Sequence, residues 1–215
     1  MKNKVVIITG GTSGIGKALA FEFGKKGSQV VLTGRNQEKL HETVRLLKAS
    51  GIDVYGIQAD ASREEDNQRM AAEVLEKFGK IDVLINNAGI SMRATFLEVD
   101  LKVLHQVMNI NFWGAVYATK YCLPSIIAQK GSVIGISSIA GYRGLPGRIG
   151  YSASKFALQG FLEVLRTEML YKNVHVLTVC PGFTASNIRN TALDKDGKPQ
   201  GESPRNEEKM MSAEE

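Results

Sequence analysis

Short apolar runs alternate along the chain with longer segments that carry apolar residues at helical spacing. A run that is apolar at every position is typical of a strand buried on both faces, and a three- or four-residue spacing is typical of a helix with one buried face. Six runs predict strands, at residues 4–8, 29–33, 53–60, 81–85, 132–138 and 173–179. Because helical segments separate these runs, we predict an α/β fold with a doubly wound parallel sheet flanked by helices.

Length and charge narrow the class of protein. A chain of 215 residues suits one α/β domain. Lys and Arg outnumber Asp and Glu by 27 to 22, and these charges are spread along the chain, which is typical of a solvated surface and predicts no nucleic-acid partner. We see no targeting segment or membrane span, and Cys122 and Cys180 lack metal-ligand spacing. We therefore expect a cytoplasmic protein with reduced core thiols and no metal.

A glycine-rich turn, Thr9-Gly10-Gly11-Thr12-Ser13-Gly14-Ile15-Gly16, joins the first predicted strand to a helix. Glycines let the backbone approach an anion, and free N–H groups at the start of a helix point at it. The spacing of Gly10, Gly14 and Gly16 differs from the G-x-G-x-x-G pattern. A phosphate cradle is the favoured interpretation, and a bare strand-to-helix turn is the alternative.

The ends of the second and third strands carry Arg35 and Asp60. An acidic residue after the second strand would bind the ribose 2′-hydroxyl of NAD, whereas an arginine there suits the 2′-phosphate of NADP. Arg35 therefore favours NADP, unless it is a surface arginine beside a helix start. Asp60 either contacts an adenine or supports its own turn. Ser62 is the expected cap of the helix that follows.

Amides and hydroxyls follow the fourth and fifth strands. The loop Asn86-Asn87-Ala88-Gly89 suits close packing against a ligand, with an Asx-rich turn as the alternative. Asn111 lies among apolar residues within a long helical segment, 101–129, so its amide needs partners. We expect it to hold a backbone group or a water, although a surface position is also open. Ser137 and Ser138 end the fifth strand.

Tyr151 and Lys155 are four residues apart in a predicted helix, so they share one helix face. A free tyrosine has a pKa of about 10, and a nearby ammonium favours the phenolate and lowers that pKa. Such a tyrosine can exchange a proton with a carbonyl or an alcohol. The pair alone is weak evidence, but in a doubly wound sheet all these loops meet beyond the carboxyl ends of the strands.

Taken together, these motifs resemble those of the short-chain dehydrogenase/reductase (SDR) family over about residues 3–189. The resemblance implies a Rossmann-type fold and a homodimer or homotetramer. It implies a cofactor site formed by Gly10, Thr12, Ser13, Gly14, Ile15, Gly16, Arg35, Asp60, Ala61, Asn87, Ala88, Gly89, Tyr151, Lys155, Pro181, Gly182 and Thr184. It also implies a catalytic set of Asn111, Ser138, Tyr151 and Lys155.

The resemblance gives each catalytic residue a role. Tyr151 would be the general acid/base, and Ser138 would orient the substrate oxygen. Lys155 would bind the nicotinamide ribose and lower the pKa of the tyrosine, and Asn111 would hold a water of the proton relay. The expected function is an NADP(H)-dependent oxidoreductase that interconverts a ketone and a secondary alcohol. A catalytically silent NADP(H)-binding regulator is the main alternative, and a purely structural protein is a third.

The last part of the chain has a different composition. Residues 1–189 form the predicted catalytic domain, and the polar residues 190–215 are expected to form a mobile substrate loop or lid. Family members usually continue through another helix and a seventh strand, so we expect the natural C-terminal portion to be missing. Met92, Phe96, Leu145 and Phe183 either line a pocket for a lipid-like ketone or are ordinary packing residues.

Overall fold

Six parallel strands form one sheet in the order β3-β2-β1-β4-β5-β6. The structure is a computed structural model that describes residues 1–201 and 210–214. The strands are β1 (Val5–Ile8), β2 (Gln29–Gly34), β3 (Val54–Gln58), β4 (Val83–Asn86), β5 (Ser132–Ile136) and β6 (His175–Val179). All six predicted strands are confirmed, and their order is that of a Rossmann-type sheet.

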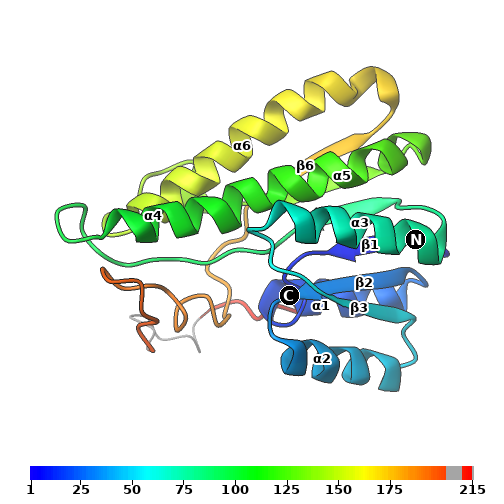
Figure 1. Cartoon of the computed structure of the whole chain (residues 1–215), viewed down its shortest axis with the longest axis horizontal. Coiled ribbons are helices and arrows are strands. Elements are labelled where there is room, and N and C mark those ends of the chain that lie inside the picture. The colour runs from blue at the N-terminus through cyan, green and yellow to red at the C-terminus, as the bar shows by residue number, and fades with distance from the viewer. Residues whose placement is uncertain (202–209, 215) are drawn as a thin grey trace.

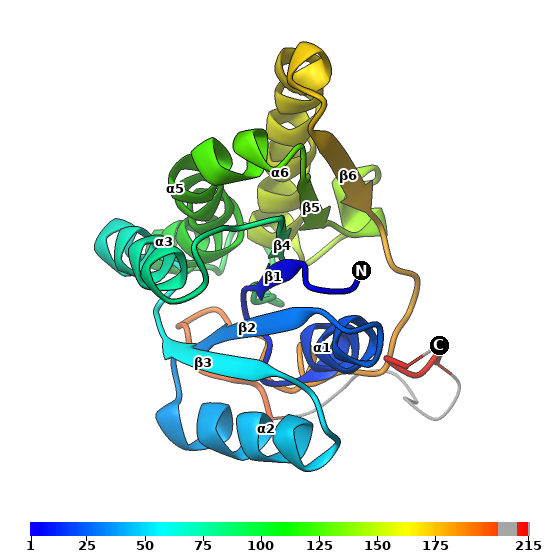
Figure 2. The ribbon, with the colours of Figure 1, turned by 90° about the vertical axis from the view of Figure 1, so that its right-hand side faces the viewer.

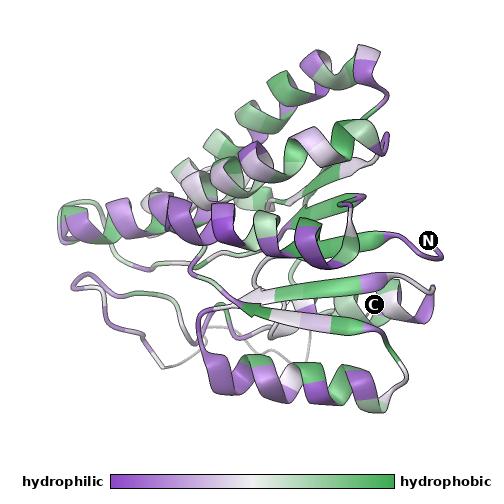
Figure 3. Ribbon diagram, turned by 45° about the vertical axis from the view of Figure 1, so that its right-hand side comes forward, coloured by the Kyte–Doolittle hydropathy of each residue, from purple (hydrophilic) through white to green (hydrophobic). Residues whose placement is uncertain are grey.

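Helices cover both faces of this sheet, as Figure 2 shows in an end-on view. The helices are α1 (Gly14–Lys25), α2 (Gln37–Ala49), α3 (Glu64–Phe78), α4 (Leu101–Met108), α5 (Gly114–Ala128) and α6 (Ile149–Met169). Because side chains alternate along a strand, Val5 and Ile7 of β1 pack with α3, α5 and α6, whereas Val6 and Ile8 pack with α1 and α2. The strands are largely hydrophobic, green in Figure 3, with polar and weakly hydrophobic residues interspersed.

The predicted helix over 101–129 is one continuous rod with an irregular middle (Figure 1). Between α4 and α5 lies a π-helix, Asn109–Trp113. A π-turn holds one more residue than an α-turn, and such turns occur frequently at functional sites. Asn111 lies inside it and is 1% exposed, so the surface alternative for this residue is wrong.

The order of the strands places two loops at the centre of the sheet edge. The chain moves from β1 to β2 and β3 on one side, and from β4 to β5 and β6 on the other. The loops after β1 and β4 therefore leave in opposite directions, which opens a crevice between them. The glycine-rich turn follows β1, and the Asn87-Ala88-Gly89 segment follows β4.

The described part of the tail packs against the domain. Ala192 and Leu193 are buried, and Leu193 forms a parallel bridge with Met92. Thr184 forms another bridge with Met211. The tail thus carries apolar contacts that its polar composition hides, while the predicted lid role remains a prediction. Residues 202–209 and 215, which belong to that predicted lid, lie outside the described residues.

Among the described helices, none combines the length and the hydropathy needed to cross a membrane.

Candidate active site

The loops at the carboxyl ends of the strands enclose a cavity of about 1190 Å³. All the predicted cofactor-binding residues except Gly16 line it, as do the predicted catalytic residues Ser138, Tyr151 and Lys155. Gly16 and Asn111 do not line it. The structure therefore brings the predicted site together at one place, with two residues in a supporting position behind its wall.

Two glycines allow the loops after β1 and β4 to approach each other. Gly10 has a φ of 64°, and a Cβ atom there would lie 2.8 Å from the Ala88 Cα atom. At Gly16, a Cβ atom would lie 2.6 Å from the Gly10 carbonyl oxygen and would also meet the Asn87 amide. The absence of a side chain at Gly16 thus permits close packing of the turn, and its predicted contact with the cofactor stays a prediction.

Asn87 and Thr9 fasten the two loops together. The Asn87 Nδ2 atom donates to the Thr9 and Gly10 carbonyl oxygens at 2.9 and 3.0 Å. The Thr9 Oγ1 atom accepts from the Asn87 and Ala88 N–H groups, both at 3.0 Å. Asn87 therefore bonds across the crevice to the glycine-rich turn. Thr9 was not among the predicted site residues, although it directly precedes the first glycine.

The N-terminus of α1 is open toward the cavity. Its N-cap residue, Ser13, makes no capping hydrogen bond with its side chain. The first N–H groups of an α-helix have no partner within the helix, and the helix dipole gives them a partial positive charge. Ser13, Gly14 and Ile15 line the cavity at this point. This arrangement fits the pyrophosphate of a dinucleotide.

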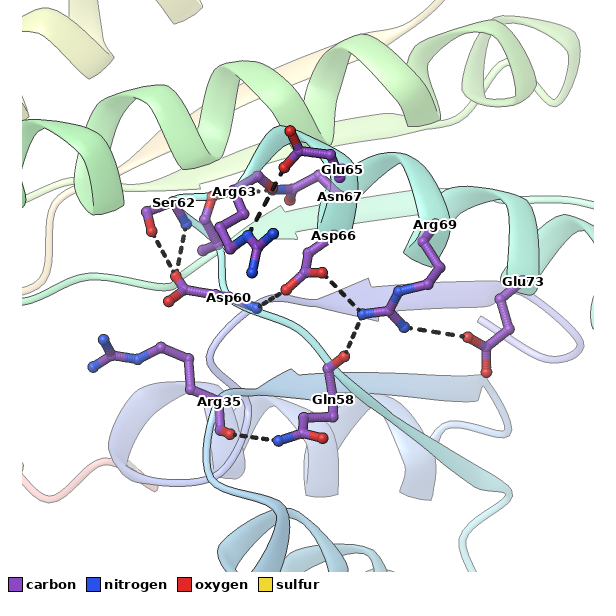
Figure 4. A network of polar contacts seen from close by, with 11 residues as sticks. Arg35, Gln58, Asp60, Ser62, Arg63, Glu65, Asp66, Asn67, Arg69 and Glu73 are labelled. Atoms are coloured by element: carbon purple, nitrogen blue, oxygen red, sulfur yellow. Dashed lines mark hydrogen bonds and ion pairs between the residues drawn. The ribbon is translucent and has the colours of Figure 1, made fainter.

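Arg35 and Asp60 lie at the far end of the cavity, beyond β2 and β3 (Figure 4). The Arg35 backbone oxygen accepts a hydrogen bond from Gln58 Nε2 at 3.0 Å. Within the described part of the chain, no hydrogen bond or ion pair to the Arg35 guanidinium is found, and the group extends past the strand ends. Lys39, one turn into α2, lines the same end and was not predicted.

Asp60 supports its own turn. Its Oδ1 atom accepts from the Ser62 N–H at 2.9 Å and from the Ser62 hydroxyl at 2.7 Å. The prediction that Ser62 caps the next helix is wrong, because its hydroxyl is engaged by Asp60 and α3 has Arg63 as its N-cap residue. Asp60 also lines the cavity, so the turn role and a contact with an adenine are compatible.

The side chain of Lys155 extends from α6 and is buried at the carboxyl end of β5. Its Nζ atom donates to the Ile136 carbonyl oxygen at 2.8 Å and lies 5.8 Å from the centre of the Tyr151 ring. The side chain is only 4% exposed. Burial removes the ammonium from water and lowers the pKa of Lys155 to about 8.

Tyr151 differs from the prediction in its electrostatics. Burial raises the pKa of Tyr151 above its ordinary value, and a hydrogen bond with Ser138 and the charges of Arg148 and Arg189 oppose this only in part. The predicted lowering by Lys155 is therefore wrong for this state, because its ammonium is directed at the Ile136 carbonyl and is itself desolvated. Tyr151 is protonated at neutral pH.

The low pKa of Lys155 makes a prediction for stability. We compare the free energies of unfolding of the parent and of Lys155→Met at each pH. The parent's value minus the variant's should rise by about 2 kcal/mol between pH 7 and pH 9.5. The folded pKa of about 8 lies below the ordinary value near 10.4, so the unfolded chain binds more protons over this interval. Urea unfolding at several pH values measures the difference. Lys172→Met, at an exposed position, is the control, and a flat profile for Lys155→Met would contradict the assignment.

Asn111 holds the loop after β4 from behind. Its Oδ1 atom accepts from the Ile90 N–H at 2.8 Å, and its Nδ2 atom donates to the Ile90 carbonyl oxygen at 2.9 Å. The second Nδ2 hydrogen goes to Ser154 Oγ at 2.9 Å. Of the two predicted roles, the backbone contact is the one observed, and the water-holding role stays a prediction. Ser154 was missed, although it lies between Tyr151 and Lys155.

The four apolar residues considered for the substrate separate into two groups. Leu145 and Phe183 line the cavity, with 41% and 51% of their surfaces exposed. Met92 is buried in a core cluster with Val103, and neither Met92 nor Phe96 lines the cavity. Met92 is therefore a packing residue, Phe96 is 61% exposed and fits neither alternative, and the pocket role of Leu145 and Phe183 stays a prediction. Within residues 1–201 and 210–214, no group of three or more His, Cys, Asp or Glu side chains is placed to hold a metal ion.

Comparisons with known proteins agree with this geometry. The family model for the short chain dehydrogenases matches residues 4–197. Dehydrogenase/reductase SDR family member 7B from Mus musculus is 40% identical over 218 residues, covering 99% of this chain and 68% of that protein.

Two solved structures are similar in fold. A short chain dehydrogenase/reductase from Burkholderia phymatum in complex with NAD has a TM-score of 0.85 at 30% identity, covering 87% of this chain and 68% of that one. An actinorhodin polyketide ketoreductase variant with NADPH has a TM-score of 0.84 at 31% identity, covering 86% and 74%. The chain therefore belongs to the short-chain dehydrogenase/reductase family, whose members are oxidoreductases acting on CH–OH and C=O groups.

Proposed function

We propose that the chain is an NADP(H)-dependent oxidoreductase that interconverts a ketone and a secondary alcohol. The observation that carries this proposal is the position of the Tyr151 phenol, which lines the same cavity as the glycine-rich turn and lies beside Ser138 and Lys155. A phenol that keeps its proton at neutral pH is suited to protonate a carbonyl oxygen as that carbonyl is reduced.

The residues present fit a nicotinamide dinucleotide. The N-terminus of α1 would hold the pyrophosphate, and Asp60 with Ala61 would lie beside the adenine. Gly89, Pro181, Gly182 and Thr184 also line the cavity, and Gly89 lies near the Lys155 ammonium, where the nicotinamide end would lie. The bound cofactor supplies hydride chemistry. NAD and NADPH in the two similar structures support a cofactor of this class.

In reduction, Tyr151 would donate its proton to the substrate oxygen, and Ser138 would hold that oxygen by a hydrogen bond. Lys155 would stabilise the phenolate that remains, because a cation nearby favours the charged form of the phenol. Asn111 would hold the loop after β4 in position through its two hydrogen bonds to the Ile90 backbone. In alcohol oxidation, Tyr151 must first lose its proton, so oxidation should increase with pH.

The preference for NADP is proposed from Arg35. Its guanidinium is exposed at the adenosine end, and Lys39 lines the same region, so both can contact a 2′-phosphate. Arg35→Asp should weaken NADPH binding by roughly tenfold to a hundredfold and improve NADH binding, because a carboxylate repels the phosphate and accepts from a ribose hydroxyl. Dissociation constants for both cofactors, measured by fluorescence titration, test this.

The matched control is Arg45→Asp, which introduces the same charge change at an exposed position of α2 away from the cavity. It should leave the NADPH to NADH ratio of affinities unchanged. Equal NADPH affinity in Arg35→Asp and the parent would show that the 2′-phosphate is not recognised by Arg35.

The function itself is tested by incubating the chain with NADPH and a panel of ketones, with the loss of NADPH absorbance as readout. Turnover of any ketone, dependent on the chain, supports the proposal. NADPH binding without turnover on any ketone would instead favour a regulatory protein that binds the nucleotide. If the chain neither bound NADPH nor turned over any ketone, the proposed nucleotide site would be contradicted.

We also propose that the chain forms a homodimer or homotetramer. Phe156 and Val164 of α6 expose 48% and 59% of their surfaces, although both are apolar. A subunit contact would bury such side chains. Sedimentation equilibrium gives the oligomeric state directly, and a monomer at high micromolar concentration would contradict this.

A further inference from the structure

One guanidinium in the cavity has buried atoms without partners. The Nε and Nη2 atoms of Arg93 are buried and make no hydrogen bond, and Arg93 lines the cavity. Arginine keeps its charge in proteins, and buried nitrogen donors without a hydrogen-bond partner are unfavourable. A bound anion would accept hydrogen bonds from these nitrogens, so we expect the site to bind an anionic ligand.

The position of Arg93 is fixed by its backbone. Its N–H donates to the Leu193 carbonyl oxygen at 2.8 Å, and its own carbonyl oxygen accepts from Gln200 Nε2 at 2.8 Å. The next residue, Ala94, donates to the Gly147 carbonyl oxygen at 3.0 Å. The backbone that carries this side chain is therefore fixed where three segments of the chain meet, and two of the guanidinium nitrogens are buried.

Arg93 lies on the Tyr151 side of the cavity. Its neighbour Met92 packs in one cluster with Leu193 and Tyr151. The pyrophosphate cradle is at the N-terminus of α1, and the adenosine end is near Arg35, so neither cofactor phosphate group accounts for Arg93. The anion that Arg93 requires is expected on the substrate.

Two more arginines strengthen the positive charge at this end. Arg148 Nη1 donates to Ser91 Oγ at 2.6 Å, and Arg189 Nη1 donates to the Thr184 carbonyl oxygen at 2.9 Å. Both line the cavity, and both lie near enough to Tyr151 to lower its pKa by their charge. Among the described residues that line the cavity, the only carboxylate is Asp60, at the adenosine end.

We propose that the substrate carries an anionic oxygen group, a carboxylate or a phosphate monoester, which Arg93 binds while Tyr151 acts on the carbonyl. The planar guanidinium fork matches both groups, because it can donate two parallel hydrogen bonds to their oxygens. This inference rests on the proposed function, since it names the class of substrate for the same site.

Calorimetric titration of the full chain with two pairs of probes, with and without saturating NADP⁺, tests whether Arg93 binds an anionic group. One pair is 4-oxopentanoate and its neutral analogue 4-oxopentanamide, and the other is hydroxyacetone phosphate and hydroxyacetone. Each anion should bind at least about tenfold more tightly than its neutral partner. The pair with the larger difference identifies carboxylate or phosphate as the preferred group.

Arg93→Met keeps an unbranched side chain of related shape and removes the charge, so the preference for the anions should disappear. Because it removes two buried nitrogens without hydrogen-bond partners, this variant should unfold at a higher temperature than the parent when no anion is added. Arg45→Met is the matched control and should keep the full preference. Equal affinities within both pairs, no binding of either anion, or a preference that survives in Arg93→Met would each overturn the inference.

These outcomes are distinguishable from failure of the proposed function. Turnover of ketones with NADPH, combined with equal affinities for anions and neutral analogues, would overturn the anion site and leave the enzyme proposal standing. Anion binding that depends on Arg93, without NADPH oxidation on any ketone, would support the anion site and contradict the enzyme proposal.

Discussion

Tyr151→Phe is expected to lower turnover by roughly 10²- to 10⁴-fold while NADPH binding changes little. The phenol is the proton donor that lines the cavity beside Ser138, and phenylalanine removes the hydroxyl while keeping the buried ring. The ring packs against the cluster that contains Met92 and Leu193, so folding should be retained. Initial rates of NADPH oxidation and a separate NADPH titration measure the two quantities.

Tyr171→Phe is the matched control, because Tyr171 is 95% exposed in the short helix after α6. It removes one phenolic hydroxyl from the chain without changing the cavity, so its turnover should equal that of the parent. A Tyr151→Phe variant that retained parental turnover would show that the proton comes from elsewhere. An equal loss in both variants would point to a general effect on folding.

Gly16→Ala has the second large expected effect, on cofactor binding and on stability. The new Cβ atom would lie 2.6 Å from the Gly10 carbonyl oxygen, and this contact involves backbone that cannot move without opening the turn. Overpacking of this kind destabilises by about 1–3 kcal/mol. The displaced turn should also lose most of its affinity for NADPH. Urea unfolding and a NADPH titration measure these changes.

Gly160→Ala is the control for this substitution. Gly160 lies in α6, and a Cβ atom there would meet nothing within 4 Å. Alanine is favoured over glycine inside a helix by about 1 kcal/mol, so this variant should be as stable as the parent or more so. If Gly16→Ala bound NADPH as the parent does, the close packing of the turn would not be needed for the site.

The six strands and the site loops were predictable because they depend on local patterns. A buried parallel strand must be apolar at almost every position, so β1 and β4 are visible as runs of β-branched and aliphatic residues. The strand order then brings the loops after the strands to one edge of the sheet. The placement of Arg35, Asp60, Ser138 and Tyr151 in one cavity follows from this rule and not from any contact visible in the sequence.

The features that were missed depend on three-dimensional packing. The close packing of Gly16 against Gly10 and Asn87 depends on how closely the loop after β4 approaches. The pKa of Tyr151 depends on how deeply it is buried and on where the Lys155 ammonium is directed, which the four-residue spacing does not specify. Arg93 was missed because a single arginine in a loop is an ordinary surface residue until its surroundings are known.

The π-helix between α4 and α5 has a further consequence for the design of the molecule. Each α-helical residue advances by about 100° around the axis, so one extra residue rotates everything after it by that amount. In an uninterrupted α-helix the buried positions of α4, Val103 and Val107, and those of α5, Ala115, Ala118, Cys122 and Ile126, would be out of phase by about 80°, and the extra residue brings both to the same side of the rod. One rod thus keeps a single buried side along its length, and its wide turn also holds Asn111 against the loop after β4.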